Sequence, residues 1–122
     1  MSEERPPTEE EVRRALTSYA AAVRAHYGAR LHDVVLFGSR ARGDAKPDSD
    51  ADLAVIIEDS DWGFWTEKMV LAGIAYEPLI EFGLQIQSWP ISRTEWENPD
   101  SHRNPRFVRN IRQDARQIKA FA

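Results

Sequence analysis

The spacing of apolar residues divides the chain into segments with helical and strand-like patterns. Between residues 8 and 27, apolar side chains recur every three or four positions, as on one face of an amphipathic helix: Val12, Leu16, Tyr19, Val23 and Tyr27. Thr8 and Glu11 have the spacing of a capping box, and Gly28 follows as a stop signal. The pattern predicts a helix over residues 8–27.

Two short apolar runs, Asp33 to Phe37 and Asp52 to Glu58, have the length and the β-branched content of strands. In the polar segment between them, Arg40 to Arg42 predicts a single helical turn that ends at Gly43, where a left-handed residue fits. A third strand is expected over Leu84 to Ser88, because apolar residues alternate there with glutamines.

Residues 62–82 have a second helical pattern, with N-cap candidates among residues 59–61 and Gly83 as the stop. The stripe expected to be buried consists of Trp65, Met69, Ala72, Tyr76 and Leu79. Residues 89–104 are expected to be irregular, with a short turn capped by Ser92 and Glu95.

A last helix is predicted to begin at Asn104 and Pro105, because proline is favoured at the first helical position. Its inward-facing residues are expected to be Phe107, Ile111 and Ile118. The resulting order of helix, strand, strand, helix, strand, helix predicts an α/β (α+β) fold, a small mixed β-sheet packed with helices. The 122 residues form one predicted domain, residues 1–122, with residues 1–7 as a flexible leader.

Composition narrows the classes of protein that fit. The chain has no cysteine, which excludes disulfides and thiolate zinc sites. Its apolar stretches are shorter than the ~20 residues that a membrane-spanning helix needs. Its first residues are acidic and lack the apolar core of a signal peptide. We therefore expect a cytoplasmic protein with no membrane contact.

The net charge of −4 is unevenly distributed along the chain. Residues 44–100 hold thirteen acidic and three basic residues, whereas residues 101–122 hold six basic residues and one acidic residue. The central acidity argues against an extended nucleic-acid surface. The basic C-terminal segment is open to three interpretations: contact with a phosphate, contact with an acidic partner, or exposure to solvent.

The candidate chemistry lies where the first two predicted strands meet. Asp50 and Asp52 are two residues apart at the start of the second strand, so they point to the same face. Two carboxylates on one face are a hard-oxygen site of the kind that Mg²⁺ prefers. Gly38 and Ser39 end the first strand in a turn whose backbone N–H groups and hydroxyl suit a phosphate.

Arginines in the same loop add positive charge to this site. Arg40 and Arg42 are both candidates for holding a phosphate, and Arg42 beside Gly43 is the better of the two. The sequence does not decide which of them instead pairs with a loop aspartate.

Gly38-Ser39, a gap of ten residues and Asp50-x-Asp52 resemble the signature of the DNA polymerase beta-like nucleotidyltransferase superfamily. The similarity is to its minimal nucleotidyltransferase (MNT) branch, and it is concentrated between Val34 and Glu58. The resemblance implies transfer of AMP from ATP with two Mg²⁺ ions. It implies that Asp50 and Asp52 are catalytic metal ligands, and that Gly38 and Ser39 hold the nucleoside triphosphate.

Many proteins of the MNT branch are antitoxins that act on a helical toxin of the HEPN type. The resemblance therefore implies a protein adenylyltransferase with a HEPN-type toxin as its partner. A small-molecule nucleotidyltransferase, of the kind that modifies antibiotics, is a further alternative.

One position departs from the superfamily pattern. A third carboxylate is expected on the next strand, where this chain has Gln85 and Gln87; Glu81 is the nearest acid that could substitute. An amide oxygen brings neither charge nor basicity. This favours the alternative of a weak or inactive antitoxin that neutralises the toxin by binding. The four tryptophans, Trp62, Trp65, Trp89 and Trp96, fit either core positions or an aromatic patch for such a partner.

Overall fold

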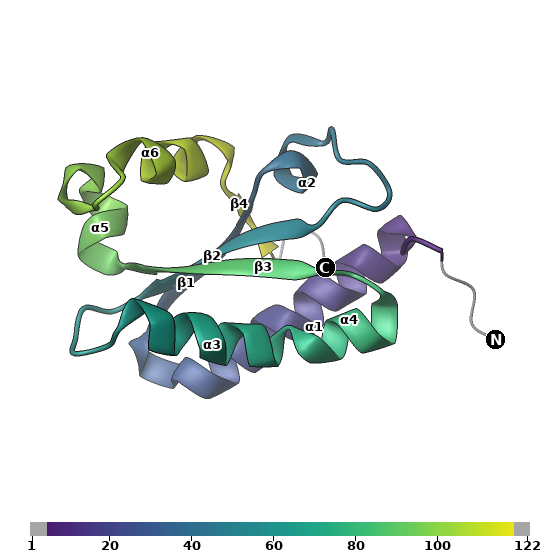
Figure 1. Ribbon diagram of the computed structural model, residues 1–122, viewed down its shortest axis with the longest axis horizontal. Helices are drawn as coiled ribbons and strands as arrows, with labels where there is room; N and C mark the ends of the chain where they lie inside the picture. The colour runs from purple at the N-terminus through teal and green to yellow at the C-terminus, as the bar shows by residue number, and fades with distance from the viewer. Residues whose placement is uncertain (1–4, 119–122) are drawn as a thin grey trace.

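The computed structural model describes residues 5–118. Its centre is a four-stranded mixed sheet with the order β3-β2-β1-β4, and helices cover both faces (Figure 1). The strands are β1 Leu31–Phe37, β2 Ala51–Ile57, β3 Ile86–Ser92 and β4 Arg116–Gln117. The helices are α1 Glu9–Tyr27, α2 Ser39–Arg42, α3 Phe64–Ile74, α4 Tyr76–Phe82, α5 Arg93–Glu97 and α6 Pro105–Asp114, with 3₁₀ turns at Gly28–Arg30 and Pro99–Ser101. The predicted α/β class and mixed sheet are confirmed.

Helix α1 begins and ends as its sequence predicts. The Thr8 hydroxyl accepts a hydrogen bond from the Glu11 backbone N–H at 3.1 Å, and the Glu11 carboxylate accepts one from the Thr8 backbone N–H at 2.9 Å. Gly28 follows the helix with a φ of 56°. The predicted leader falls partly outside the described residues; within them, Arg5 forms a 2.8 Å ion pair with Glu11.

Strand pairing brings the ends of three strands together. β1 and β2 are antiparallel and pair Phe37 with Asp52, while β2 and β3 are parallel and pair Asp52 with Gln87. The predicted turn between β1 and β2 is helix α2, and Gly43 ends it in the left-handed conformation with a φ of 84°. Because β2 lies between β1 and β3, Asp52 is flanked by both neighbouring strand ends.

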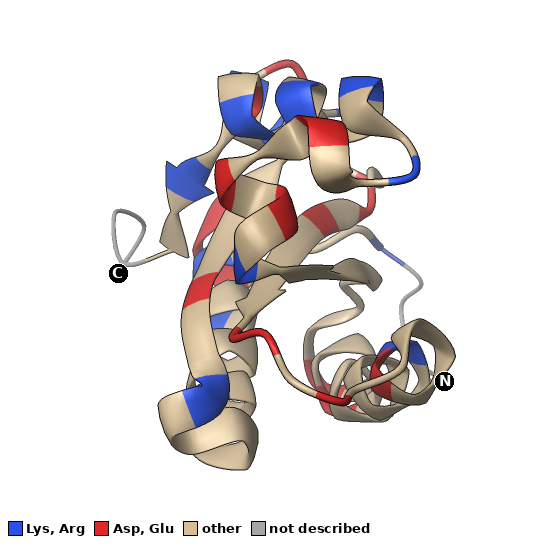
Figure 2. Cartoon of the chain, turned by 90° about the vertical axis from the view of Figure 1, so that its left-hand side faces the viewer, with Lys and Arg blue, Asp and Glu red and all other residues tan. Residues whose placement is uncertain are grey.

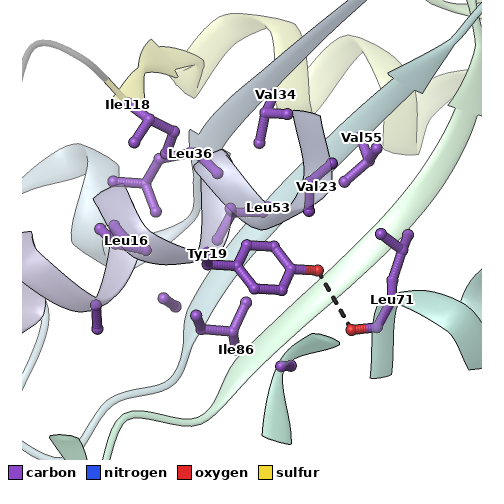
Figure 3. Packing of buried hydrophobic residues seen from close by; sticks show 14 of the residues in the cluster. Leu16, Tyr19, Val23, Val34, Leu36, Leu53, Val55, Leu71, Ile86 and Ile118 are labelled. Atoms are coloured by element: carbon purple, nitrogen blue, oxygen red, sulfur yellow. Dashed lines mark hydrogen bonds between the residues drawn. The ribbon is translucent and has the colours of Figure 1, made fainter. Parts of the chain in front are cut away.

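The larger core lies between the sheet and helices α1, α3 and α4 (Figure 3). From β2 it includes Leu53, Val55 and Ile57, and from α1 it includes Leu16, Tyr19 and Val23. The Tyr19 hydroxyl hydrogen-bonds the Ser88 hydroxyl at 2.6 Å and donates to the Leu71 carbonyl at 3.4 Å. Burial raises the pKa of Tyr19 to about 12. The polar end of this aromatic ring is therefore satisfied inside the core.

A smaller core lies on the other face, beneath α6. Its buried residues are Val35, Ala54, Ile56, Ile91 and Ile111. Asn104 caps α6 by accepting from the Phe107 backbone N–H at 3.2 Å. The predicted start of this helix and the burial of Ile111 are confirmed; Ile118 is also buried, but it follows the helix and joins the larger core.

The prediction of one helix over residues 62–82 is wrong, because the segment forms α3 and α4 with a break at Ala75. Pro78 has no N–H to donate to the carbonyl four residues earlier, so the helical hydrogen bonds cannot continue across this point. The cap is Gly63 rather than one of residues 59–61. Gly83 ends α4 in the left-handed conformation, as predicted.

The predicted buried stripe of this segment is also wrong. Trp65, Met69 and Tyr76 are 73%, 70% and 63% exposed, and Ala72 and Leu79 are exposed as well. The buried residues are Glu67, Leu71, Ala75 and Pro78. The true face is offset by two residues from the expected one, which turns it by about 200° around the helix.

Strand β3 differs from its prediction in position. It covers Ile86–Ser92 rather than Leu84 to Ser88, so residues 89–92 are not irregular. Pro90 is tolerated because β3 is an edge strand, where a missing backbone N–H need not break a ladder. Ser92 and Glu95 form the predicted capping box, at the start of α5. Within residues 5–118, no helix is long and apolar enough to span a bilayer.

Candidate active site

Gly38 and Asp52 touch at the point where β1 ends and β2 begins. Gly38 has a φ of 76° and a ψ of −157°, a conformation that is essentially restricted to glycine. A Cβ at this position would lie 2.7 Å from Oδ2 of Asp52. The turn can therefore approach the carboxylate this closely only because residue 38 has no side chain. Ser39, which follows as the first residue of α2, is half-buried beside the pair.

The surroundings of Asp52 disfavour the ionised form of its carboxyl group. Partial burial raises its pKa above the ordinary value, and the negative charge of Asp50 raises it further. The positive charges of Arg42 and Lys68 act in the opposite direction. A carboxylate whose charge is disfavoured in this way gains stability when a cation binds next to it.

The donor set around Asp52 fits Mg²⁺ in part. Asp50 is exposed directly before β2, so two carboxylates are available to a cation at this corner. In the part of the chain that the structure describes, no group of three acidic, histidine or cysteine side chains gathers around one point. Mg²⁺ is commonly held by one or two carboxylates, with water and substrate phosphates supplying the remaining ligands. Asp50 and Asp52 would suffice for that arrangement.

The three candidates for the third position lie in two places. Gln87 is the register partner of Asp52 on β3 and is half-buried. Gln85 and Glu81 line a different hollow of about 1110 Å³ together with Asp50. Gln87 is thus the side chain that stands beside Asp52, whereas Glu81 shares the outer rim with Asp50.

The two loop arginines have different contacts. Arg40 donates from Nε and Nη2 to the Ser49 carbonyl at 3.1 and 2.9 Å, and from Nη2 to the Pro47 carbonyl at 3.1 Å, so it holds the loop together. Arg42 pairs with Asp44 at 3.3 Å and with Asp114 of α6 at 2.9 Å. Arg42 is exposed, and exposed ion pairs contribute little to stability, so replacing them by a contact with a phosphate would cost little free energy. Its phosphate-binding role stays a prediction.

Sequence reasoning overlooked Lys68 on α3. Its ammonium group donates to the Ser88 carbonyl of β3 at 2.5 Å and lies 3.7 Å from the ring centroid of Trp89. Desolvation lowers the pKa of Lys68, and the charge of Asp52 opposes that shift. One signal was available in the sequence, because Lys68 is the only basic residue between Lys46 and Arg93.

The basic C-terminal segment lies on the same side of the sheet as α2. Figure 2 shows blue Lys and Arg positions gathered at the top of the molecule, where Figure 1 places α6. Arg109 forms an ion pair with Asp100, and the guanidinium of Arg112 lies 5.9 Å from the ring centroid of Trp96. Part of this charge is therefore already engaged within the chain.

Comparisons with known proteins can be set beside this geometry. The sequence profile of the nucleotidyltransferase domain family matches residues 17–117. A crystal structure from Sulfolobus solfataricus, described as that of a nucleotidyltransferase candidate, has a TM-score of 0.55 at 20% sequence identity. The similarity covers 73% of this chain and 76% of the other. No curated protein matches the chain in sequence. At this sequence identity, the structural similarity establishes a shared fold and carries no information about activity.

Proposed function

The chain belongs to the nucleotidyltransferase domain family, and we propose that it transfers AMP from ATP to a partner protein in a Mg²⁺-dependent reaction. The partner we propose is a HEPN-type toxin, for which this chain is the antitoxin. The observation that supports catalysis best is the contact between Gly38 and Asp52. It sets a turn suited to phosphate directly against a carboxylate suited to a cation.

In the proposed reaction, two pairs of residues have different roles. Asp50 and Asp52 hold the metal, and Gly38 and Ser39 hold the triphosphate tail. When bound, Mg²⁺ supplies charge neutralisation for the phosphates and the leaving pyrophosphate. The acceptor hydroxyl forms a bond to the α-phosphorus, the bond to the β-phosphate breaks, and pyrophosphate leaves with its electrons. Gln87 cannot accept the hydroxyl proton, which passes instead to solvent or to a phosphate oxygen.

Label transfer tests the enzymatic proposal. The purified protein is incubated with Mg²⁺, the product of the neighbouring gene as the candidate toxin, and ATP labelled on either the α- or the γ-phosphate. We expect label on this candidate acceptor from the α-position only. Asp52→Asn should reduce transfer by roughly 10²–10³-fold, the loss typical of one group that stabilises transition-state charge. Asp48→Asn is the matched control, because Asp48 is an exposed acid of the same loop. Equal rates for both variants would refute the proposal.

A second function, neutralisation by binding alone, is favoured by one specific observation. Gln87 stands beside Asp52 where a charged third ligand would strengthen metal binding. Toxin-expressing cells that carry the double variant Asp50→Ala and Asp52→Ala separate the two functions. Full rescue of growth by this variant would establish occlusion, whereas loss of rescue by a folded variant would require catalysis.

A further inference from the structure

A cleft of about 1010 Å³ lies along β3, the edge strand next to Asp52. One wall comes from Trp62 and from the first two residues of α3, Phe64 and Trp65. The other wall comes from β3 and α6, with Trp89 and Phe107. Five aromatic side chains on two walls make this an aromatic slot beside the candidate active site.

Three charged or polar side chains of the cleft, Asp59, Glu95 and His102, are engaged with the chain itself, whereas Arg103 is exposed. The Asp59 carboxylate accepts a hydrogen bond from the Thr94 backbone N–H at 3.1 Å. The Glu95 carboxylate accepts from the Ser92 backbone N–H, and Nδ1 of His102 accepts from the Asn104 backbone N–H. Aromatic surface is consequently what the cleft mainly offers, and it suits a flat, uncharged aromatic group.

An aromatic wall connects the cleft to Asp52. The Phe107 ring makes edge-to-face contacts with Phe37 and Trp89, at centroid distances of 6.2 and 5.7 Å. Phe37 is the register partner of Asp52 on β1. Trp89 is two residues beyond Gln87, so both side chains point to the same face and their Cα atoms are about 7 Å apart.

Lys68 fixes the ring that forms the near end of the cleft. Its ammonium group covers one face of Trp89 while it donates to the Ser88 carbonyl. Because Lys68 contacts both the Trp89 ring and the backbone of the preceding residue, Ser88, the Trp89 side chain has little freedom to change its orientation. The wall is thus held in place before any ligand arrives.

The geometry of the proposed reaction indicates on which side of the α-phosphate the acceptor binds. In the proposed reaction the triphosphate tail lies at Gly38 and Ser39, beyond the end of β1, and the metal ligands are Asp50, directly before β2, and Asp52 of β2. In an in-line displacement the attacking and leaving oxygens are on opposite sides of the phosphorus. The sheet order β4-β1-β2-β3 therefore leaves the side of β3 for the acceptor.

We propose that the cleft is the anchoring subsite for the protein acceptor and receives one of its aromatic side chains, set roughly 7 Å or more from the reacting hydroxyl along β3. The assignment rests on the proposed function, because the position of the leaving group defines the acceptor side. The anchored ring is separate from the hydroxyl that receives AMP. Anchoring contributes orientation of the acceptor rather than chemistry.

Binding of a small probe tests the slot without catalysis. ¹⁵N-labelled protein is titrated with benzamide and, as a non-planar control of similar polarity, with cyclohexanecarboxamide. We expect benzamide to shift the indole N–H signals of Trp62, Trp65 and Trp89, but not that of Trp96, which does not line the cleft. Absence of shifts up to about 10 mM, roughly ten times a Kd of about 1 mM, would overturn the proposal.

Two exposed residues of α3 provide a matched pair of variants. Trp65 lines the cleft, whereas Met69, one turn further along, does not. Trp65→Ala should weaken benzamide binding by about 2–10-fold, as expected for one lost aromatic contact, and Met69→Ala should not change it. Equal affinities for the two variants would overturn the proposal. Both side chains are about 70% exposed, so neither change should affect folding.

Two further measurements identify the occupant. Saturating Mg²⁺ and α,β-methylene-ATP should leave the benzamide shifts in place; displacement would mean that the cleft holds the nucleobase. In the transfer assay, benzamide and Trp65→Ala should raise the KM for the protein acceptor and leave the KM for ATP unchanged. Label transfer that is insensitive to both would overturn the anchoring subsite alone, whereas no transfer at all would refute the proposed function.

Discussion

The two faces of the sheet use the same strands for different purposes. The face under α1, α3 and α4 carries a cluster of nineteen buried residues, whereas the face under α6 carries a cluster of five. The difference arises because α6 covers only part of its face. At the end of β1, Phe37 still packs against Phe107 of α6, whereas Asp52 and Gln87, at the starts of β2 and β3, lie beyond that contact and are half-buried. Most of the buried core therefore lies on one side of the sheet, and the candidate active site lies on the other.

Strand β2 shows the division residue by residue. Leu53, Val55 and Ile57 enter the larger core, while Ala54 and Ile56 enter the smaller one and Asp52 lies at its open end. Because side chains alternate, a slip of one residue would exchange the two sets. The buried alternate positions therefore fix the register that places the carboxylate.

The largest effect on stability is expected from Leu53→Ala. Leu53 is fully buried in the larger core, next to Asp52 in sequence but on the opposite face. We expect a loss of about 2–5 kcal/mol in the free energy of unfolding, measured by urea denaturation, from lost burial and a residual cavity. Binding of Mg²⁺ and nucleotide by the folded fraction should persist. A well-folded Leu53→Ala protein that no longer binds them would show that the faces are not separate in function.

Gly38→Ala should affect both stability and the site. The methyl group would meet Oδ2 of Asp52 at 2.7 Å in a conformation that costs a non-glycine residue about 1–3 kcal/mol. Gly43→Ala is the matched control, since Gly43 also has a positive φ but a Cβ there would meet nothing within 4 Å. Calorimetry should show weaker binding of Mg²⁺ and nucleotide for Gly38→Ala only. Weakening by both variants to the same degree would assign the effect to loop strain.

Tyr27→Phe tests the buried carboxylate of the larger core. The Tyr27 hydroxyl donates to Glu67 at 2.6 Å, and Glu67 is only 8% exposed. Loss of the hydroxyl should cost about 1–3 kcal/mol in thermal or urea unfolding, because it leaves a buried acceptor unsatisfied. The double variant Tyr27→Phe and Glu67→Met should recover part of that loss, since it removes both polar partners. A double variant less stable than Tyr27→Phe would show that Glu67 has a further partner.

The features that the sequence could predict are those that depend on residues close together in the chain. Local signals are carried by neighbouring residues, so the capping box of Thr8 and Glu11, the left-handed Gly43 and the start of α6 at Pro105 were all predictable. The sequence also indicated that the Gly38–Ser39 turn and the aspartates lie where the first two strands meet, but it did not predict the close approach of Gly38 to Asp52. Each of these features depends on few residues and on backbone geometry.

Features that depend on tertiary packing were not predictable in the same way. The segment of α3 and α4 is apolar on more than one side, so its periodicity did not identify the buried face, and Pro78 was overlooked as the cause of the break. Lys68 belongs to α3, and its ammonium group contacts the Ser88 carbonyl and the Trp89 ring of the edge strand β3. Its position depends on how α3 packs on β3, which no local pattern encodes. Of the tryptophans, Trp65 is exposed and the other three are half-buried, so neither simple expectation was met.

The smallest effect is expected from Asp52→Asn on the stability of the protein without ligands. The pKa of Asp52 is raised in the folded state, so the ionised carboxylate disfavours folding at neutral pH. Asparagine should raise the melting temperature there, by the equivalent of less than about 1 kcal/mol, because solvent screens the half-exposed group. The gain should be full above the raised pKa and vanish as the pH falls below about 3.9, where the carboxyl is protonated in both states. A lower melting temperature for Asp52→Asn at neutral pH would mean that Arg42 and Lys68 outweigh burial and Asp50, and that this corner of the open face is not held under electrostatic strain.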